Sequence, residues 1–397
     1  MATERSGMKR YGGLEGLRAW LAWTVVFSHI SALTGLGRTA PWLAQPLARV
    51  ADLAVMVFIA ISGFVITHLI QSKPEPYRAY IARRFMRIYP VYLVALIAGI
   101  GGTYLAFDAF GALPWGDASP PNARLLKQAD SLRQGDLIWH LAAHLSMLHG
   151  AVSSKVLYES QYMFLGPAWS LSLEWQFYLL APLAVGLAKH RLGQVLLVAL
   201  ALWGHSLYAK GALGQFFLPS VLPGAVLYFG VGMATRFLLP NGASSPLKTY
   251  PLALLALGFG FFKGPELQAI LVWAAFVAMM LLDPQSADVM SRFARRAFAM
   301  LFDTPWVRRL GALSYATYLI HMPILQLVSW YAIRQLHLGP GQTLCVLLGV
   351  AVPLILLASR LLHQHVELPG MALVRRRQGA QPSAGLGQSL PAPGLGR

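Results

Sequence analysis

Long runs of apolar residues, each bounded by polar or charged segments, recur along the whole chain. Ten runs occupy residues 19–37, 50–71, 88–107, 168–188, 192–210, 217–239, 250–262, 267–282, 312–333 and 342–364. Because a helix of about 20 apolar residues spans a bilayer, this pattern predicts an all-α polytopic membrane protein with about ten transmembrane helices in one bundle. The stretch from Asp136 to Gly150 is too short and too polar to span, which favours a helix at the membrane face.

Composition and charge support this interpretation. The 397 residues are 56% hydrophobic and 12% charged, whereas an ordinary soluble domain has about 25% charged residues. This balance excludes intrinsic disorder and argues against a large water-soluble enzyme. With a cytoplasmic N-terminus and ten crossings, 21 of the 32 lysines and arginines fall on the cytoplasmic side and nine outside. The positive-inside rule then explains most of the +17 net charge, so we expect cytoplasmic termini and no nucleic-acid partner.

The chain divides into three segments. Residues 1–10 are polar and predict a cytoplasmic N-terminus with no removable signal peptide. Residues 11–370 predict one membrane domain, with an extracytoplasmic loop at about 108–166. Residues 371–397 carry three consecutive arginines followed by a stretch rich in Gly, Pro, Ser and Gln, which predicts a disordered cytoplasmic tail. A multi-pass chain of this kind is expected in the cell inner (cytoplasmic) membrane.

The first apolar run carries a stripe of ionisable residues. Arg18 and His29 are 11 residues apart, which on a helix places them about 20° apart around the axis and about 16 Å apart along it. Glu15 lies three residues before Arg18, on nearly the same side. Taken singly, His29 could be a buried hydrogen-bonded histidine and Arg18 a snorkelling interfacial charge. Their joint spacing favours a functional site, because intramembrane charges are costly.

A second cluster precedes the third run. Arg83, Arg84 and Arg87 lie at its cytoplasmic start, and Arg84 and Arg87 share a helix face. The positive-inside rule alone would place arginines here. The alternative is a site for an anionic cytoplasmic ligand, because guanidinium groups match phosphate oxygens.

Four further residues are candidate acceptor or structural polar groups. Trp169 and Glu174 lie in the fourth run, the carboxylate about 9 Å into the membrane by helix rise, where it needs a partner or water. His321 lies in the middle of the ninth run. Ser62, followed by Gly63, is expected to break the second run near its centre, where glycine also allows close backbone approach.

Metal and nucleotide signals are weak. His140 and His144 are spaced i,i+4 but have no convergent third ligand and lack the glutamate of the zinc-protease pattern. No phosphate-cradling glycine loop and no Gly-x-Ser-x-Gly element occurs. We therefore expect no metal site.

Six ordered motifs, spread over about residues 11–370, resemble those of the integral-membrane acyltransferase family 3, the family of O-antigen, exopolysaccharide and Nod-factor O-acetylases and macrolide acylases. They are Leu14-Glu15-Gly16-Leu17-Arg18-Ala19 followed by His29, Val57 to Phe64, Arg83 to Pro90, Trp169 to Tyr178, Leu310 to Pro323, and Val366-Glu367-Leu368-Pro369. One departure is that Glu15 stands where the family commonly has Asp.

The resemblance implies ten core helices and transfer of an acyl group from cytoplasmic acyl-CoA to a glycan or lipid-linked sugar. It implies that His29 is catalytic, that Arg18 belongs to the same motif, and that Arg84 and Arg87 bind the donor. Acetyl-CoA is then the expected donor substrate, with no permanently bound cofactor. The expected partners are a glycan acceptor, membrane lipid, and a second copy or a polysaccharide-assembly protein.

The residues suggest a mechanism. Acylation of a sugar hydroxyl needs a base, which His29 can supply, or His29 can carry the acyl group transiently. Glu15 or Arg18 could set its tautomer or hold the thioester and phosphates, while the acceptor approaches near Glu174 and the 108–166 loop. Two other classes stay open. A transporter of a glycan or lipid would use the same residues as a proton or substrate path, and a structural scaffold would need none of them.

Overall fold

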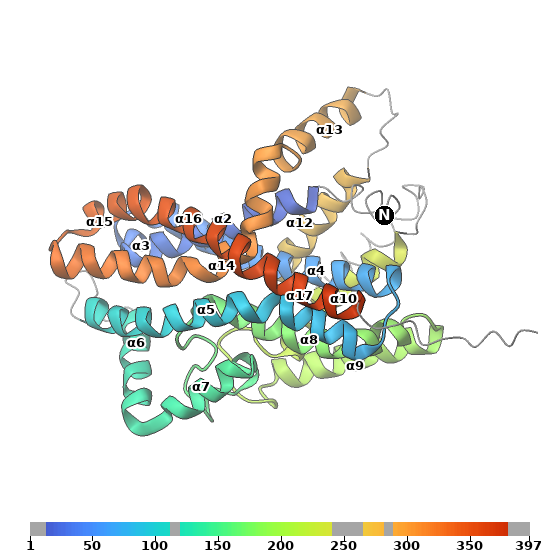
Figure 1. Ribbon diagram of the computed structural model, residues 1–397, viewed down its shortest axis with the longest axis horizontal. Coiled ribbons are helices and arrows are strands. Elements are labelled where there is room, and N and C mark those ends of the chain that lie inside the picture. The colour runs from blue at the N-terminus through green and yellow to red at the C-terminus, as the bar shows by residue number, and fades with distance from the viewer. Residues whose placement is uncertain (1–12, 112–119, 240–264, 282–288, 380–397) are drawn as a thin grey trace, which may run out of the picture.

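The computed structural model describes residues 13–111, 120–239, 265–281 and 289–379 (Figure 1). The secondary structure of these ranges is helical, without a strand. The helices are α2 (Gly13–Leu33), α3 (Leu36–Thr39), α4 (Pro41–Ser72), α5 (Tyr77–Gly111), α6 (Pro120–Ser131), α7 (Leu137–Leu145), α8 (Trp169–Leu187), α9 (Arg191–Ala209), α10 (Leu222–Leu238), α12 (Pro265–Met280), α13 (Val289–Phe302), α14 (Pro305–Trp330), α15 (Pro340–Val346), α16 (Val352–Leu362) and α17 (Leu368–Gly379). Shorter 3-10 or π turns join several of them.

Nine of the ten predicted runs lie on these helices, and the run at 250–262 lies outside the described residues. Four segments are long and apolar enough to cross a membrane: Pro41–Ser72, Tyr77–Ala109, Arg191–Ala209 and Pro340–Leu373. This finding confirms an all-helical membrane protein. The number of ten crossings and the cytoplasmic position of the termini stay predictions.

Three helices are long enough to span but less apolar. Helices α2, α8 and α14 contain 21, 19 and 26 residues. Each carries ionisable residues of the candidate site, namely Arg18 and His29, Glu174, and His321. Helix α14 packs along both α2 and α5, and α4 packs along α2, α8 and α10. These polar helices therefore lie within the bundle, where their side chains find protein partners rather than lipid.

Helix α4 passes without interruption through Ser62 and Gly63, so the predicted break in the second span is wrong. The predicted close approach is correct. A Cβ atom on Gly63 would collide with the backbone carbonyl of Phe229 in α10, and one on Gly232 would collide with that of Ala60. Glycine serves here to bring two helix backbones together rather than to bend one.

Helix α5 extends well before the predicted third span and includes the arginine cluster. Pro90 lies inside it and cannot donate a backbone hydrogen bond to Met86. Gly370 of α17 packs against this site, where a Cβ atom would lie 3.0 Å from the Met86 carbonyl oxygen. Helix α17 continues to Gly379, beyond the boundary expected at residue 370.

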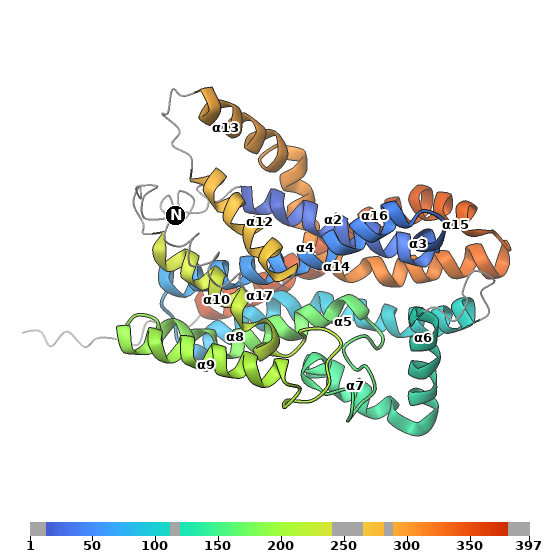
Figure 2. The ribbon, with the colours of Figure 1, turned by 180° about the vertical axis from the view of Figure 1, so that it is seen from behind.

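Most of the long predicted loop forms an arm beside the bundle, which we call the loop arm (residues 120–165). Its helices α6 and α7 leave the end of α5 and turn back under it (Figures 1 and 2). In α7, His140 and His144 are fully buried, whereas Ile138 and Trp139 are 69% and 66% exposed. An apolar exposed face fits the helix predicted at the membrane surface.

Candidate active site

The site centres on two histidines from neighbouring helices. His29 of α2 and His321 of α14 have ring centroids 5.2 Å apart, with an angle of 38° between the ring planes. His321 is fully buried, and its Nδ1 atom lies 3.1 Å from the carbonyl oxygen of Thr317. His29 is only partly buried, so it is the more exposed member of the pair.

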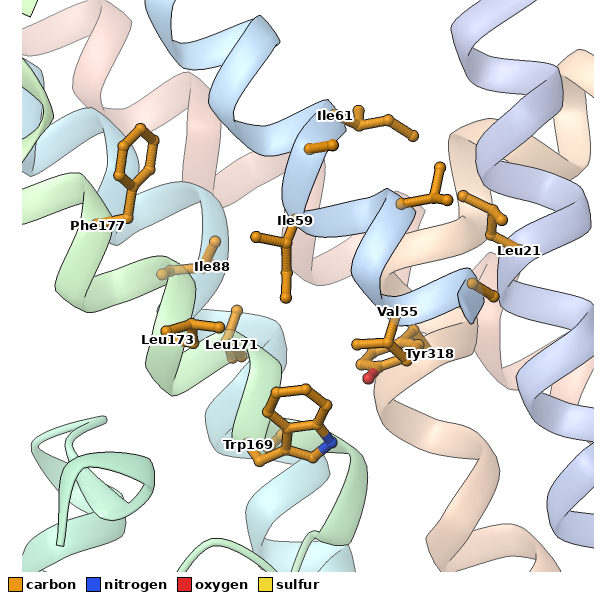
Figure 3. Close-up of a cluster of buried hydrophobic side chains, with 14 of the residues drawn as sticks. Leu21, Val55, Ile59, Ile61, Ile88, Trp169, Leu171, Leu173, Phe177 and Tyr318 are labelled. Atoms are coloured by element: carbon orange, nitrogen blue, oxygen red, sulfur yellow. The ribbon is translucent and has the colours of Figure 1, made fainter. Parts of the chain in front are cut away.

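On the N-terminal side of His321, α14 faces the start of α8. The hydroxyl groups of Tyr318 and Ser170 are 3.0 Å apart, and the Tyr318 ring lies 6.1 Å from that of His321. Trp169, 6% exposed, lies across from Tyr318, whose hydroxyl points toward it (Figure 3). Tyr318 thus lies between His321 on its own helix and Ser170, the neighbour of Trp169, on α8.

Glu174 of α8 has cationic neighbours from two other helices. It accepts a hydrogen bond of 3.2 Å from the Tyr178 hydroxyl, and the Ser62 hydroxyl lies beside both residues. The guanidinium groups of Arg18 and Arg87 attract it. The structure therefore groups Glu174 with the arginines, whereas the sequence had suggested a place near the outer acceptor.

Glu15 makes an ion pair with Arg18, with 3.4 Å between Oε1 and Nη1. Glu15 and His29 are 14 residues apart in one helix, which corresponds to about 21 Å along its axis. Direct contact between them is therefore excluded, and so is the idea that Glu15 sets the His29 tautomer by a hydrogen bond. Arg18 is likewise too far down α2 to touch His29.

The three arginines of α5 have different environments. Arg83 is paired with Glu75. Within the described part of the chain, Arg84 and Arg87 make no ion pair, and the buried Nε of Arg84 has no hydrogen-bond partner. Arg87 contacts the Sδ of Met371 at 3.5 Å. Arg84 and Arg87 thus remain able to bind an anion, whereas Arg83 is already neutralised.

A family model described as an acyltransferase domain, that of acyltransferase family 3, matches residues 11–360. The chain belongs to this family. It is similar to Acyltransferase MdmB of Streptomyces mycarofaciens, with 25% identity over 405 aligned residues that cover 93% of this chain and 94% of the relative. No solved structure matches it. The membrane acyltransferase activity follows at this coarse level.

Sequence reasoning gave no role to two tyrosines of this acyltransferase. Tyr315 donates a hydrogen bond of 2.6 Å to the Ile88 carbonyl, and Glu174 and Arg87 lie in its electrostatic surroundings. Tyr318 follows three residues later, and His321 three after that. The i, i+3, i+6 spacing of polar groups in an apolar run was the signal that could have revealed them.

Together these side chains form what we call the polar column: Arg84, Arg87, Glu174, Tyr315, Tyr318, His321 and His29. It runs from the guanidinium groups of Arg84 and Arg87 in α5 along α14 to the histidine pair. Tyr315 and His321 are six positions apart in α14, which corresponds to about 9 Å of helix. Arginine side chains and an imidazole pair therefore lie at the two ends of a series of polar groups within an apolar bundle.

The loop arm has a cavity of about 260 Å³ lined by Lys127, Asp130, Ser131, Gln134, Asp136 and Tyr158, and it also contains a cluster of buried histidines. The stacked rings of His144 and His149 have centroids 4.1 Å apart. His144 Nδ1 and Nε2 lie 2.8 and 2.7 Å from the carbonyl oxygens of His140 and Met163. The described residues contain no group of three or more histidine, cysteine, aspartate or glutamate side chains placed to hold a metal.

Proposed function

We propose that this chain is an O-acyltransferase that moves an acyl group, acetyl in the simplest case, from cytoplasmic acyl-CoA to a hydroxyl of a cell-surface glycan, lipid-linked saccharide or other glycosylated acceptor. It would act as a multi-pass enzyme of the inner membrane, with acyl-CoA as a substrate rather than a resident cofactor. The observation that carries the proposal is the polar column, which has at one end two arginines that make no ion pair among the described residues and at the other a partly buried histidine.

The donor would bind at Arg84 and Arg87. Guanidinium groups form charge-assisted, often bidentate hydrogen bonds with phosphate, and CoA presents phosphates on its nucleotide part. Its pantetheine arm is an extended chain with amide groups, suited to lie beside Glu174, Tyr315 and Tyr318. The thioester at its end would then reach His29. Arg83 has no part in this binding because Glu75 occupies it.

The transfer needs one base. The free ring nitrogen of His29 takes the proton of the acceptor hydroxyl while the oxygen attacks the thioester carbonyl carbon. The new C–O bond forms and the C–S bond breaks, and His29 returns the proton to the departing thiolate sulfur. Atoms and charges balance without a metal or redox step. The acceptor would approach past Trp169 and Tyr318.

Purified protein in nanodiscs provides the test of donor use. We expect CoA and acetyl-CoA to raise its thermal unfolding temperature, and cells with the gene to carry surface glycan heavier by one acetyl unit per modified sugar. His29→Ala should abolish the mass difference at normal protein levels. His205→Ala, which removes another histidine from the apolar helix α9, should preserve it.

The competing interpretation as a transporter gives a different result. If the chain exported a glycan or lipid, His29→Ala would change the amount of surface glycan and leave its mass per repeat unchanged. Full acetylation by the His29→Ala protein would overturn the assignment of the base.

A further inference from the structure

His321 has one defined tautomer. Its Nδ1 atom lies 3.1 Å from the carbonyl oxygen of Thr317, and because a carbonyl oxygen can only accept, Nδ1 must carry the proton. In a neutral ring the other nitrogen, Nε2, then has a lone pair and no hydrogen. Nε2 is buried and has no hydrogen-bond partner among the described residues.

An unpartnered buried nitrogen is costly, so it calls for an explanation. Helix α14 gives His321 a site with no solvent contact, and the nearest ionisable ring is His29 at 5.2 Å between centroids. Since imidazole atoms lie about 1.2 Å from the ring centre, facing edges at this separation approach to about 3 Å, the length of a hydrogen bond. In this structure the ring planes are inclined by 38°, and His321 Nε2 forms no hydrogen bond with His29.

We propose that His321 is a positioning residue for His29, and that its Nε2 accepts an N–H hydrogen bond from His29 when substrates bind. This inference rests on the proposed function. The rotation needed is that of a partly exposed ring, which is the mobile member of the pair, while Thr317 holds the other. Catalytic hydrogen bonds are often long before the substrate arrives and shorten afterwards.

The bond would fix the chemistry of His29. When one nitrogen of His29 donates to His321, the opposite nitrogen must bear the lone pair, and it points away from α14 toward the acceptor. The same bond becomes charge-assisted when His29 holds the hydroxyl proton, so it strengthens as the transition state forms. A carboxylate supplies this function in the serine-protease triad, whereas here Glu15 is too distant and a neutral imidazole takes its place.

A histidine that only fills space makes different predictions. A packing role requires the shape of the ring, and a positioning role requires an acceptor atom at Nε2. The amide oxygen of glutamine can occupy nearly the same place as Nε2, whereas leucine cannot accept a hydrogen bond. His321→Gln and His321→Leu therefore separate the two roles.

The test uses full-length protein in nanodiscs with acetyl-CoA as donor and the surface glycan of a gene-deleted strain as acceptor. We expect His321→Leu to lower kcat about a hundredfold with an unchanged KM for acetyl-CoA, and His321→Gln to recover at least a tenth of the wild-type kcat. Ser329→Ala, which alters another fully buried polar group of α14, should leave both constants unchanged. Wild-type kcat in His321→Leu, or equal loss in both variants, would overturn the role of His321.

A second measurement does not depend on turnover. In protein labelled with ring-¹⁵N histidine and bound to CoA, nitrogen chemical shifts report the tautomer of His29 directly. We expect one dominant tautomer in the wild type and His321→Gln, and a mixture of both in His321→Leu. The same mixture in all three proteins would refute the positioning role even if acyl transfer is confirmed. A wild-type protein that transfers no acyl group would instead refute the proposed function.

Discussion

Gly311 of α14 lies directly against the backbone carbonyl of Glu15 in α2, so closely that a Cβ atom on Gly311 would overlap the carbonyl oxygen. From this contact, α14 reaches His321 after ten residues and α2 reaches His29 after fourteen. The absence of a side chain at Gly311 therefore brings the N-terminal parts of α14 and α2 into backbone contact, and these two helices carry His321 and His29 further along.

Gly311→Ala should destabilise the protein and impair transfer. The added methyl group must push α2 away from α14, and overpacking of this kind costs about 1–3 kcal/mol. We expect a lower unfolding temperature in detergent and at least a tenfold loss of kcat. Gly230→Ala is the matched control, because nothing lies within 4 Å of a Cβ atom at Gly230. Equal behaviour of the two variants would contradict the close-contact argument.

Arg84→Ala and Arg87→Ala should raise the KM for acetyl-CoA. Each removes a charge-assisted hydrogen bond to phosphate, worth about 1.5–3 kcal/mol, so the expected increase is roughly tenfold to a hundredfold. Titration calorimetry with CoA measures the same loss directly.

Arg83→Ala is the comparison for both variants. It should leave the KM for acetyl-CoA unchanged and lower the stability of the fold instead. The reason is that it removes the ion-pair partner of the Glu75 carboxylate, whose side chain is only 11% exposed. A rise in KM for Arg83→Ala as large as for the other two would contradict the separation of Arg83 from the donor site, and an unchanged KM in all three variants would indicate that the positive-inside rule alone explains the cluster.

The helices could be predicted because a span needs about 20 apolar residues whatever its neighbours are, and the nine described runs all fall on helices. The shared face of Arg18 and Glu15 followed from helix periodicity alone. Contacts between distant segments could not be predicted in this way. His29 and His321 are separated by almost the whole domain, and no periodic pattern specifies which helix packs against which.

Two local expectations failed for related reasons. Gly63 was expected to break α4, but a glycine inside a packed membrane helix keeps its backbone hydrogen bonds and contributes only a close contact with Phe229. Arg83 was grouped with Arg84 and Arg87, but the turn before α5 brings Glu75 to it. In both cases a neighbouring segment, invisible in the local sequence, decided the role of the residue.

The predicted topology can be tested with single cysteines. Cys345 is exposed, so Cys345→Ser supplies the background. In the Cys345→Ser background, Lys155→Cys in the loop arm should react with a membrane-impermeant maleimide added to spheroplasts. Lys73→Cys, between α4 and α5, should react only after the membrane is permeabilised. Labelling of Lys73→Cys from outside would reverse the orientation inferred from the positive-inside rule.

Tyr318 and Ser170 should act as one unit. Their hydroxyl groups are 3.0 Å apart between α14 and α8, and a neutral hydrogen bond is worth about 1 kcal/mol. We expect Tyr318→Phe, Ser170→Ala and the double variant to show similar losses of kcat, each about fivefold. Tyr331→Phe, at a site that is 53% exposed, should have no effect. Additive losses in the double variant would show that the two hydroxyl groups act separately.

The loop arm should open as the pH falls. Burial lowers the pKa of His140 and of His144 to about 4, from the ordinary value of 6.5, and holds the pKa of His149 well below that value. Below pH 6.5 an opened arm takes up protons that the closed arm does not, so its stability is complete above pH 6.5 and is lost progressively toward pH 4. The equilibrium constant for opening should rise by up to about tenfold per pH unit for each histidine involved.

Hydrogen exchange of peptides from α7, corrected for intrinsic rates, measures this equilibrium constant at pH 7 and pH 5. Peptides from α13, which contains no histidine, serve as the reference, and His140→Gln should make the dependence less steep. An opening constant that is the same at both pH values would show that burial of these rings does not couple the arm to protons.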